Sequence, residues 1–143
     1  MVLKFGGTSV ADIPQIKNIA LKIKLEVEKG NKVIVVVSAM SGVTNNLINL
    51  VKNTSDLPPY SEYDTVISTG GQITSALLAI ALEKISIKAR PWLGWQIPRL
   101  TDKTYGKSLI EKIKTDNISK DLEVNQVAIV SGFQGVSSEN RIT

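Results

Sequence analysis

The sequence predicts an α/β fold with a mainly parallel central sheet, because two strand-like runs flank an amphipathic helical segment. Val2 to Phe5 and Lys32 to Val37 are short apolar runs, and the second is almost continuously β-branched, which is typical of a strand covered on both faces. Between them, apolar residues recur every three or four positions from Ile13 to Val27, as in an amphipathic helix. Strand, helix and strand in this order predict a right-handed βαβ unit that binds ligands at the carboxyl ends of its strands.

The composition is that of one globular domain without thiol or imidazole chemistry. The 143 residues are 43% hydrophobic and include no cysteine and no histidine. Chemistry therefore falls to lysines, carboxylates, hydroxyls and backbone dipoles. We find no apolar run that approaches the roughly 20 residues of a membrane span, and the chain begins on a strand instead of a basic, cleavable leader. We expect a cytoplasmic protein with no membrane partner.

Charge is spread along the predicted helices instead of being gathered into a patch. The net charge is +4, but the lysines are interspersed with acids, as at Lys24, Glu26 and Glu28, and no run of basic residues is interleaved with aromatic ones. This distribution is typical of a solvated surface, so we expect no nucleic-acid partner.

The first loop of the chain is a candidate phosphate site. Lys4 ends the first predicted strand, Gly6 and Gly7 follow it, and Asp12 is a predicted N-cap of the next helix. Glycines let backbone N–H groups turn toward one anion, and an adjacent ammonium adds a point charge. The loop matches neither the Walker pattern nor the dinucleotide-binding pattern. An ordinary glycine turn is the alternative.

A similar polar loop follows the second predicted strand. Ser38 and Thr44 lie in a run of small and hydroxylated residues before a short amphipathic helix at 45–52. Because parallel strands end at the same edge of a sheet, we expect these side chains to face Lys4 and Gly6 across a cleft. Capping of the short helix is the alternative role for both hydroxyls.

The middle of the chain predicts two helices separated by a break. A short helix is expected at 62–68 and a largely buried one at 72–84, interrupted by Ser68-Thr69-Gly70-Gly71. A helix that begins at such a break would present its positive dipole end, which makes a second candidate anion site. A plain turn between helices is the alternative.

The rest of the chain predicts further strands and connections. Residues 116–122 are too polar for a firm prediction, and we expect both tryptophans to be packing anchors. The expected segments are a surface connection at 53–61, a strand at 87–92, a loop at 94–102, a short strand at 108–113, a strand at 126–133 and a hairpin turning at 138–140.

Four motifs, in this order along the chain, resemble those of aspartate kinases, members of the amino-acid kinase superfamily. The resemblance runs along the whole chain but covers only the first part of that family's kinase domain. It implies a truncated three-layer α/β sandwich in which residues 1–143 form the substrate and phosphate lobe, while the nucleotide lobe and the ACT domains are absent. The motifs are Lys4 to Asp12, Val35 to Asn45, Ser68 to Gln72 and Gly132 to Gly135.

The resemblance implies phosphoryl transfer from ATP, with Mg²⁺, to the β-carboxylate of L-aspartate, in the biosynthesis of lysine, threonine and methionine. An ionised carboxylate needs no general base, so alignment and positive charge suffice. By resemblance, Lys4 is the catalytic residue that stabilises the transferred phosphoryl group. Phe5, Gly6 and Gly7 complete the segment that holds the cofactor, and no protein metal ligand is implied.

On the substrate side, the resemblance implies that Ser38 and Thr44 hydrogen-bond aspartate. The family has Glu at the position of Gly71, where it contacts the substrate's ammonium group. With this Glu and the downstream segment missing, we expect an isolated fragment with little or no activity, as a possible homo-oligomer or in association with a separately encoded C-terminal part. The alternative is a non-catalytic binding or assembly module from a split or decaying kinase gene.

Overall fold

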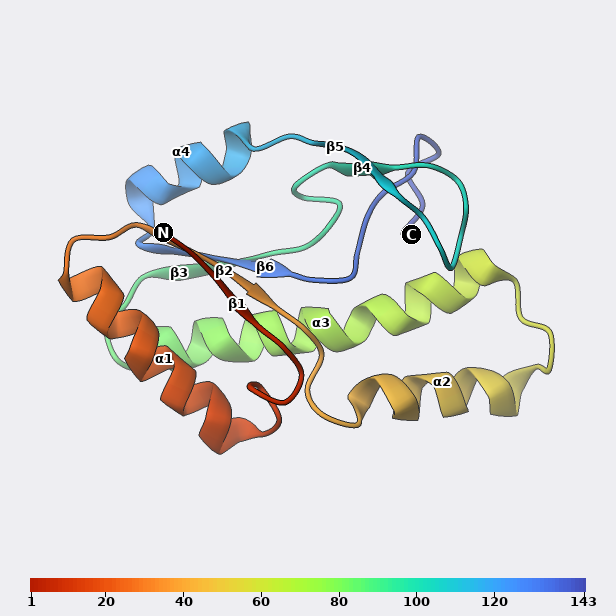
Figure 1. Cartoon of the computed structure of the whole chain (residues 1–143), viewed down its shortest axis with the longest axis horizontal. Coiled ribbons are helices and arrows are strands. Elements are labelled where there is room, and N and C mark those ends of the chain that lie inside the picture. The colour runs from red at the N-terminus through yellow and green to blue at the C-terminus, as the bar shows by residue number, and fades with distance from the viewer.

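A four-stranded parallel sheet forms the centre of the molecule in a computed structural model that describes all residues, 1–143 (Figure 1). Its strand order is β1-β2-β6-β3, and every neighbouring pair is parallel. The predicted parallel α/β fold is therefore confirmed, and so is the central place of the second strand. The four strands are β1 (Val2–Phe5), β2 (Val33–Val37), β3 (Ala89–Trp92) and β6 (Val127–Ser131).

The two central strands are apolar throughout because both of their faces are covered. All five residues of β6 are buried, and β2 alternates between buried and half-buried positions. Strand β1 lies at an edge, where Val2 and Lys4 are exposed while Leu3 and Phe5 pack against the core. Helices on both faces of a parallel sheet favour such continuous apolar strands.

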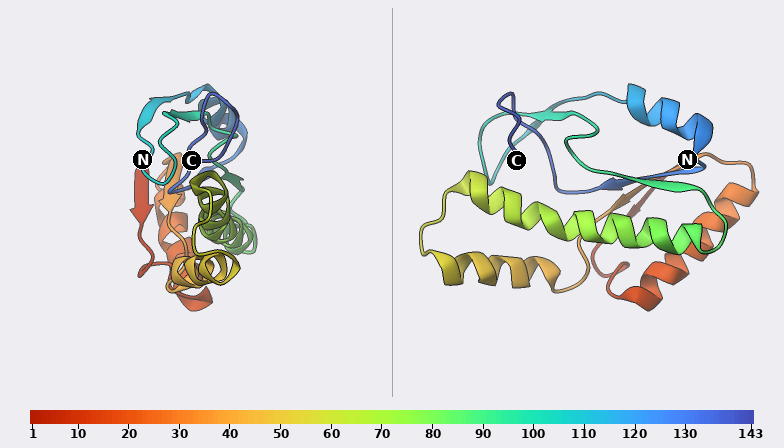
Figure 2. Two further views of the ribbon diagram at one scale, coloured as in Figure 1. Left: turned by 90° about the vertical axis from the view of Figure 1, so that its right-hand side faces the viewer. Right: turned by 180° about the vertical axis from the view of Figure 1, so that it is seen from behind.

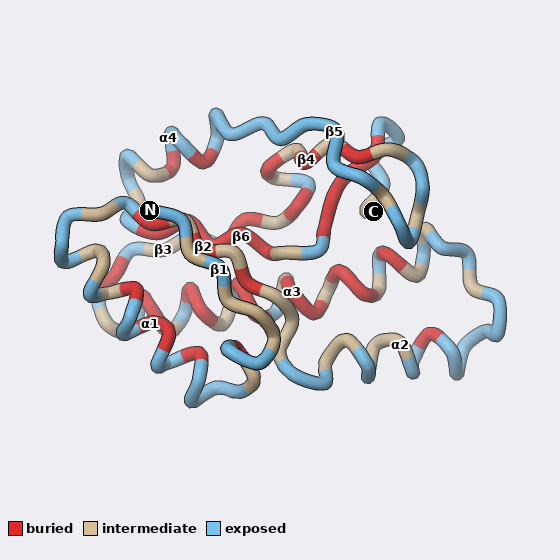
Figure 3. The backbone as a smooth tube through the Cα atoms, viewed as in Figure 1, coloured by how far each residue is buried: buried red, intermediate tan, exposed pale blue.

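One face of the sheet is covered by helices α1 (Ile13–Glu28) and α3 (Tyr60–Glu83), with α2 (Val43–Thr54) lying beside α3 (Figures 1 and 2). Helix α1 begins at the predicted cap, where an Asp12 carboxylate oxygen accepts a hydrogen bond from the Gln15 N–H at 2.8 Å. The buried core of this face lies between the helices and the sheet (Figure 3). Its largest fully buried members include Ile16, Ile23, Val35, Leu78, Leu82 and Ile129.

The opposite face is covered by α4 (Asp116–Val124), which completes three layers (Figure 2). The sequence offers little sign of this helix because Ile118 is its only buried apolar residue. Asp121 anchors the helix by accepting hydrogen bonds from the indole Nε1 of Trp92 at 3.1 Å and from Arg90 at 3.3 Å. The predicted packing role is confirmed for Trp92 and wrong for Trp95, which is 54% exposed.

The predicted break in the middle of the chain does not exist, because α3 runs without interruption from Tyr60 to Glu83. The hydroxyls of Ser68 and Thr69 donate to carbonyl oxygens three residues earlier, at 2.8 and 2.7 Å. Gly70 is helical and allows close packing, since a Cβ there would lie 2.9 Å from the Cβ of Ala39. The anion site that we expected at a helix N-terminus in this segment was therefore a wrong prediction.

The continuity of α3 also corrects the expectation that no apolar run approaches the length of a membrane span. Over an 18-residue window its mean hydropathy is 1.5, so by length and composition alone it could cross a membrane. Half of that window is buried inside the protein. The helix packs along β3 and β6 and against α1, and this packing accounts for its apolar character.

Two short strands form a separate antiparallel ribbon, β4 (Arg99–Thr101) with β5 (Ile110–Ile113). The segment 94–102, predicted as a loop, therefore contains a strand, while the strand predicted at 108–113 is confirmed. The hairpin predicted around 138–140 is also present, closed by the Ser137 N–H donating to the Arg141 carbonyl at 2.9 Å. Asn140 turns it with φ of 58°.

Candidate functional site

The loop after β1 lies against the loop after β2, at the carboxyl ends of the two strands. The Ser38 N–H donates to the Phe5 carbonyl at 3.2 Å, which extends the strand pairing into the loops. Gly7 allows the close approach, because a Cβ there would lie 3.2 Å from the Ala39 carbonyl oxygen. Gly6 faces open space, with no atom within 4 Å of an added Cβ. The backbone at Gly6 is thus accessible to a ligand.

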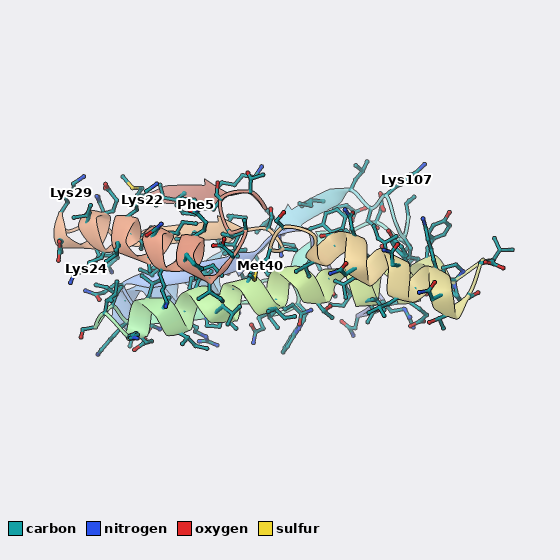
Figure 4. The ribbon with its side chains drawn as sticks, turned by 90° about the horizontal axis from the view of Figure 1, so that it is seen from below. Phe5, Lys22, Lys24, Lys29, Met40 and Lys107 are labelled. Atoms are coloured by element: carbon teal, nitrogen blue, oxygen red, sulfur yellow. The ribbon has the colours of Figure 1, made fainter.

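Lys4 lies beside this loop with its side chain free of the rest of the chain. Its strand neighbour Phe5 packs into the core, and strand geometry places Lys4 on the other face, beside Val36 of β2. The Lys4 ammonium has no ion-pair partner in the chain. Figure 4 shows Lys22, Lys24 and Lys29 around α1, and Lys107 well away from them on the other half of the molecule.

A pocket of about 230 Å³ lies between the ends of β2 and β6 and the middle of α3. It brings together Ser38 and Thr44 from one predicted motif and Gly71 from another. Their roles toward a substrate stay predictions. The pocket is lined by Ser38, Ala39, Thr44, Ile67, Ser68, Gly71, Gly132 and Phe133.

Helix capping does not account for the two hydroxyls of this pocket. The N-cap of helix α2 is Gly42, which adopts φ of 76°, and no side chain caps the N-terminus of the helix. Neither Ser38 nor Thr44 has a side-chain hydrogen bond to α2, so the capping alternative was wrong. Both hydroxyls remain available to a ligand.

The floor of the pocket is held by the segment after β6. The side-chain amide of Gln134 donates to the Ser68 carbonyl at 2.9 Å and to Ser131 Oγ at 2.8 Å, and its oxygen accepts from the Gly94 N–H at 2.8 Å. Gly132 donates to the Val37 carbonyl at 2.8 Å. These bonds join α3, β2 and β6 and make the pocket a rigid part of the fold.

Gly71 is packed tightly against that floor. A Cβ at this position would lie 2.6 Å from Ser131 Oγ and 3.3 Å from the Gly132 carbonyl oxygen. Any side chain at Gly71 therefore requires the Ser131 hydroxyl to move.

Phe133 is a candidate site residue to which the sequence analysis assigned no role, although it ends a predicted strand and lies in the fourth motif, Gly132 to Gly135. It lines the pocket with 80% of its surface exposed, and its φ is 54°. A large non-glycine residue in the left-handed region is uncommon and is often found at functional sites. Its position directly after Gly132, within a conspicuous Gly-Phe-Gln-Gly run, is the signal that could have drawn attention to it.

The family of the chain follows from comparison with known proteins. A family model described as the amino acid kinase family matches residues 1–143. The chain belongs to the amino acid kinase family.

Within that family, the similar curated proteins are aspartate kinases. The aspartokinase of Rickettsia conorii is 49% identical over all of this chain and 36% of its own length, and the aspartate kinase of Pseudomonas putida is 45% identical over all of this chain and 35% of its own. The chain thus spans about a third of the length of these relatives. The resemblance stated from the motifs is confirmed.

Solved structures agree on the fold. The aspartate kinase from Synechocystis superposes with a TM-score of 0.81 at 38% identity, covering 96% of this chain and 22% of that one. Aspartokinase III of E. coli, in complex with aspartate and ADP, superposes with a TM-score of 0.80 at 18% identity, covering 99% of this chain and 42% of that one. At 18% identity the second comparison supports the fold alone.

Proposed function

We propose that this chain forms the substrate and phosphate part of an aspartate kinase domain, which transfers a phosphoryl group from ATP to the β-carboxylate of L-aspartate. The observation that carries the proposal is the pocket that joins Ser38, Thr44 and Gly71 next to the open glycine loop. The similarity to aspartokinases over the whole chain supports the same choice of substrate.

The residues of the opening loop fit the phosphate part of ATP. Gly6 leaves its backbone open to a ligand, and Lys4 provides an unpaired ammonium beside it. Bound ATP would supply the phosphoryl group, and the chain's part is to align and neutralise it. Backbone N–H groups and an ammonium are donors that suit phosphate oxygens, whereas Mg²⁺ takes oxygen ligands, so this loop fits the phosphates and not the metal.

On the other side of the pocket, the hydroxyls of Ser38 and Thr44 would orient the aspartate. Each hydroxyl can donate one hydrogen bond to a carboxylate oxygen. Because aspartate is already ionised at neutral pH, orientation is the main contribution that these groups make. The Gly71 position offers no charge to the substrate ammonium, and we therefore expect the isolated chain to turn over aspartate very slowly or not at all.

The proposal is tested by joining residues 1–143 to the C-terminal part of an intact aspartate kinase and measuring aspartyl phosphate. We expect Gly71→Glu to raise activity by about 10- to 100-fold, since a charged hydrogen bond contributes about 1.5–3 kcal/mol. Gly71→Ala is the matched control, because it meets Ser131 Oγ in the same way without adding a carboxylate. Equal activity of all three proteins would contradict the role assigned to this position.

Nucleotide binding is tested separately on the 143-residue chain by calorimetry with ATP. We expect weak binding that Lys4→Met weakens by about 10-fold or more and that Lys4→Arg largely retains, because the contribution is one of charge. ATP binding that is unaffected by Lys4→Met would place the nucleotide elsewhere.

A non-catalytic binding or assembly module is the second candidate. It is favoured by the packing at Gly71, where the backbone lies so close to Ser131 that the pocket is shaped for glycine. This function predicts a chain that binds aspartate or a partner protein and stays inactive in the chimera with either Gly71 or Gly71→Glu.

A further inference from the structure

A second cavity, of about 220 Å³, is lined by residues of the β4–β5 ribbon, its connecting loop, the start of α3 and the segment after β6. It shares Phe133 with the first pocket, the one around Ser38, Thr44 and Gly71, and none of that pocket's other residues. The residues around it are mostly polar, and only Ile110 and Phe133 are hydrophobic. Its polar side chains include Asp64, Arg99, Thr101, Lys107, Ser108 and Thr143.

Arg99 is the unusual member of this cavity, because its guanidinium is buried without a counter-ion. The residue is 8% exposed, it has no carboxylate oxygen within 4.0 Å, and its Nε is buried without a hydrogen-bond partner. The single hydrogen bond of its side chain runs from Nη2 to the Ser131 carbonyl. Burial lowers the pKa of Arg99, yet arginine stays charged at physiological pH.

No acidic side chain of the cavity pairs with this charge. Asp64 is its only acidic side chain; it accepts a hydrogen bond from the Gly106 N–H at 2.7 Å and forms no ion pair with Arg99 or Lys107. Lys107, from the loop between β4 and β5, adds a second positive charge to the residues that line the cavity, and its side chain projects outward from the molecule (Figure 4). A buried charge without a partner is strongly destabilising, so the site favours the entry of an anion.

We propose that this cavity binds a small oxyanion, a carboxylate or a phosphate, with Arg99 as its counter-charge. A guanidinium presents N–H groups that match the oxygens of either anion. The hydroxyls of Thr101 and Thr143, which lie 2.7 Å apart, offer a further donor at the same cavity. At about 220 Å³ the cavity is smaller than the roughly 300–1,000 Å³ of sites for drug-sized ligands, so the ligand is small.

The test compares thermal melting of the 143-residue chain in sodium acetate, potassium phosphate and chloride at equal ionic strength. We expect acetate or phosphate to raise the melting temperature by about 5–10 °C at a hundredfold excess over Kd. Lys4→Met should retain the rise, which separates this cavity from the opening loop and keeps the result independent of the proposed kinase function. In this Lys4→Met background, Arg99→Leu should abolish the rise while melting no lower than Lys4→Met in chloride.

An NMR titration gives a second readout that does not depend on stability. The Arg99 Nε–H resonance, identified by its loss in Arg99→Lys, should shift with acetate or phosphate and not with chloride. The anion that produces the shift identifies the ligand class. The proposal is overturned if neither anion moves this resonance, or if the anion-dependent melting shift survives Arg99→Leu in the Lys4→Met background.

Discussion

The two cavities on either side of Phe133 are built on opposite principles. The pocket around Ser38, Thr44 and Gly71 is lined by hydroxyls, glycines and apolar groups, and its shape depends on backbones that approach within contact distance. The second cavity contains Arg99, Asp64 and Lys107 and depends on charges that the chain leaves unneutralised. We therefore expect the first site to be sensitive to changes in side-chain volume and the second to changes in side-chain charge.

Gly132→Val should give the largest loss of stability, and it tests the sensitivity of the pocket around Ser38, Thr44 and Gly71 to side-chain volume. A Cβ at Gly132 would lie 2.9 Å from the Val37 carbonyl oxygen, a backbone atom that is held in the sheet. We expect the free energy of unfolding to fall by about 2–3 kcal/mol, as measured by urea denaturation. Gly6→Ala is the control, since its Cβ meets no atom within 4 Å, and it should stay within about 0.5 kcal/mol of the parent. Equal losses of unfolding free energy from Gly132→Val and Gly6→Ala would contradict the sensitivity of this pocket to volume.

Substitutions of Phe133 should have an intermediate effect and test the wall that the two cavities share. Glycine accepts φ of 54° without steric cost, whereas alanine keeps the strain. The ring is 80% exposed, so either change removes little packing. We expect Phe133→Gly to be more stable than Phe133→Ala by about 1 kcal/mol in thermal or urea unfolding. If alanine is the more stable of the two, the backbone at this position is not held in the left-handed region.

Asp64→Asn should give the smallest effect and tests the sensitivity of the second cavity to charge. Burial raises the pKa of the Asp64 carboxyl, against the opposing effect of the hydrogen bond from the Gly106 N–H. Below the unfolded-state pKa, the carboxyl is protonated in both states and costs nothing. As the pH rises through the unfolded and then the folded pKa, the folded chain must bury the charge, so stability is lost.

The corresponding measurement is the free energy of unfolding between about pH 3.5 and 7, the range that begins near the ordinary pKa of aspartate. The parent chain should lose stability relative to Asp64→Asn as the pH rises, because Asn can still accept the hydrogen bond from Gly106 and cannot ionise. Asp56→Asn, at an exposed acid, should run parallel to the parent. A parent curve that gains stability over Asp64→Asn with rising pH would reverse the sign and disprove this account.

Local patterns in the sequence were sufficient to predict much of the sheet and the first helix that covers it. The apolar runs predicted β1, β2 and β6, and the spacing of isoleucines with the Asp12 cap predicted α1. These signals work because a strand or an amphipathic helix depends on the period of its own side chains. The motifs also selected Ser38, Thr44 and Gly71, which the fold gathers into one pocket.

Only the tertiary structure decided the features that depend on distant neighbours. Helix α3 continues through Gly70 and Gly71 because Ala39 and Ser131 pack closely against them, a gain in contact that offsets the low helix propensity of glycine. Helix α4 forms where Asp121 meets Trp92, 29 positions away in sequence. Arg99 shows no sign of burial in its own sequence context. It is buried because the Ser131 carbonyl and the backbone at Gly94 lie against its guanidinium, and a contact with a segment as distant as Ser131 leaves no periodic pattern in the sequence.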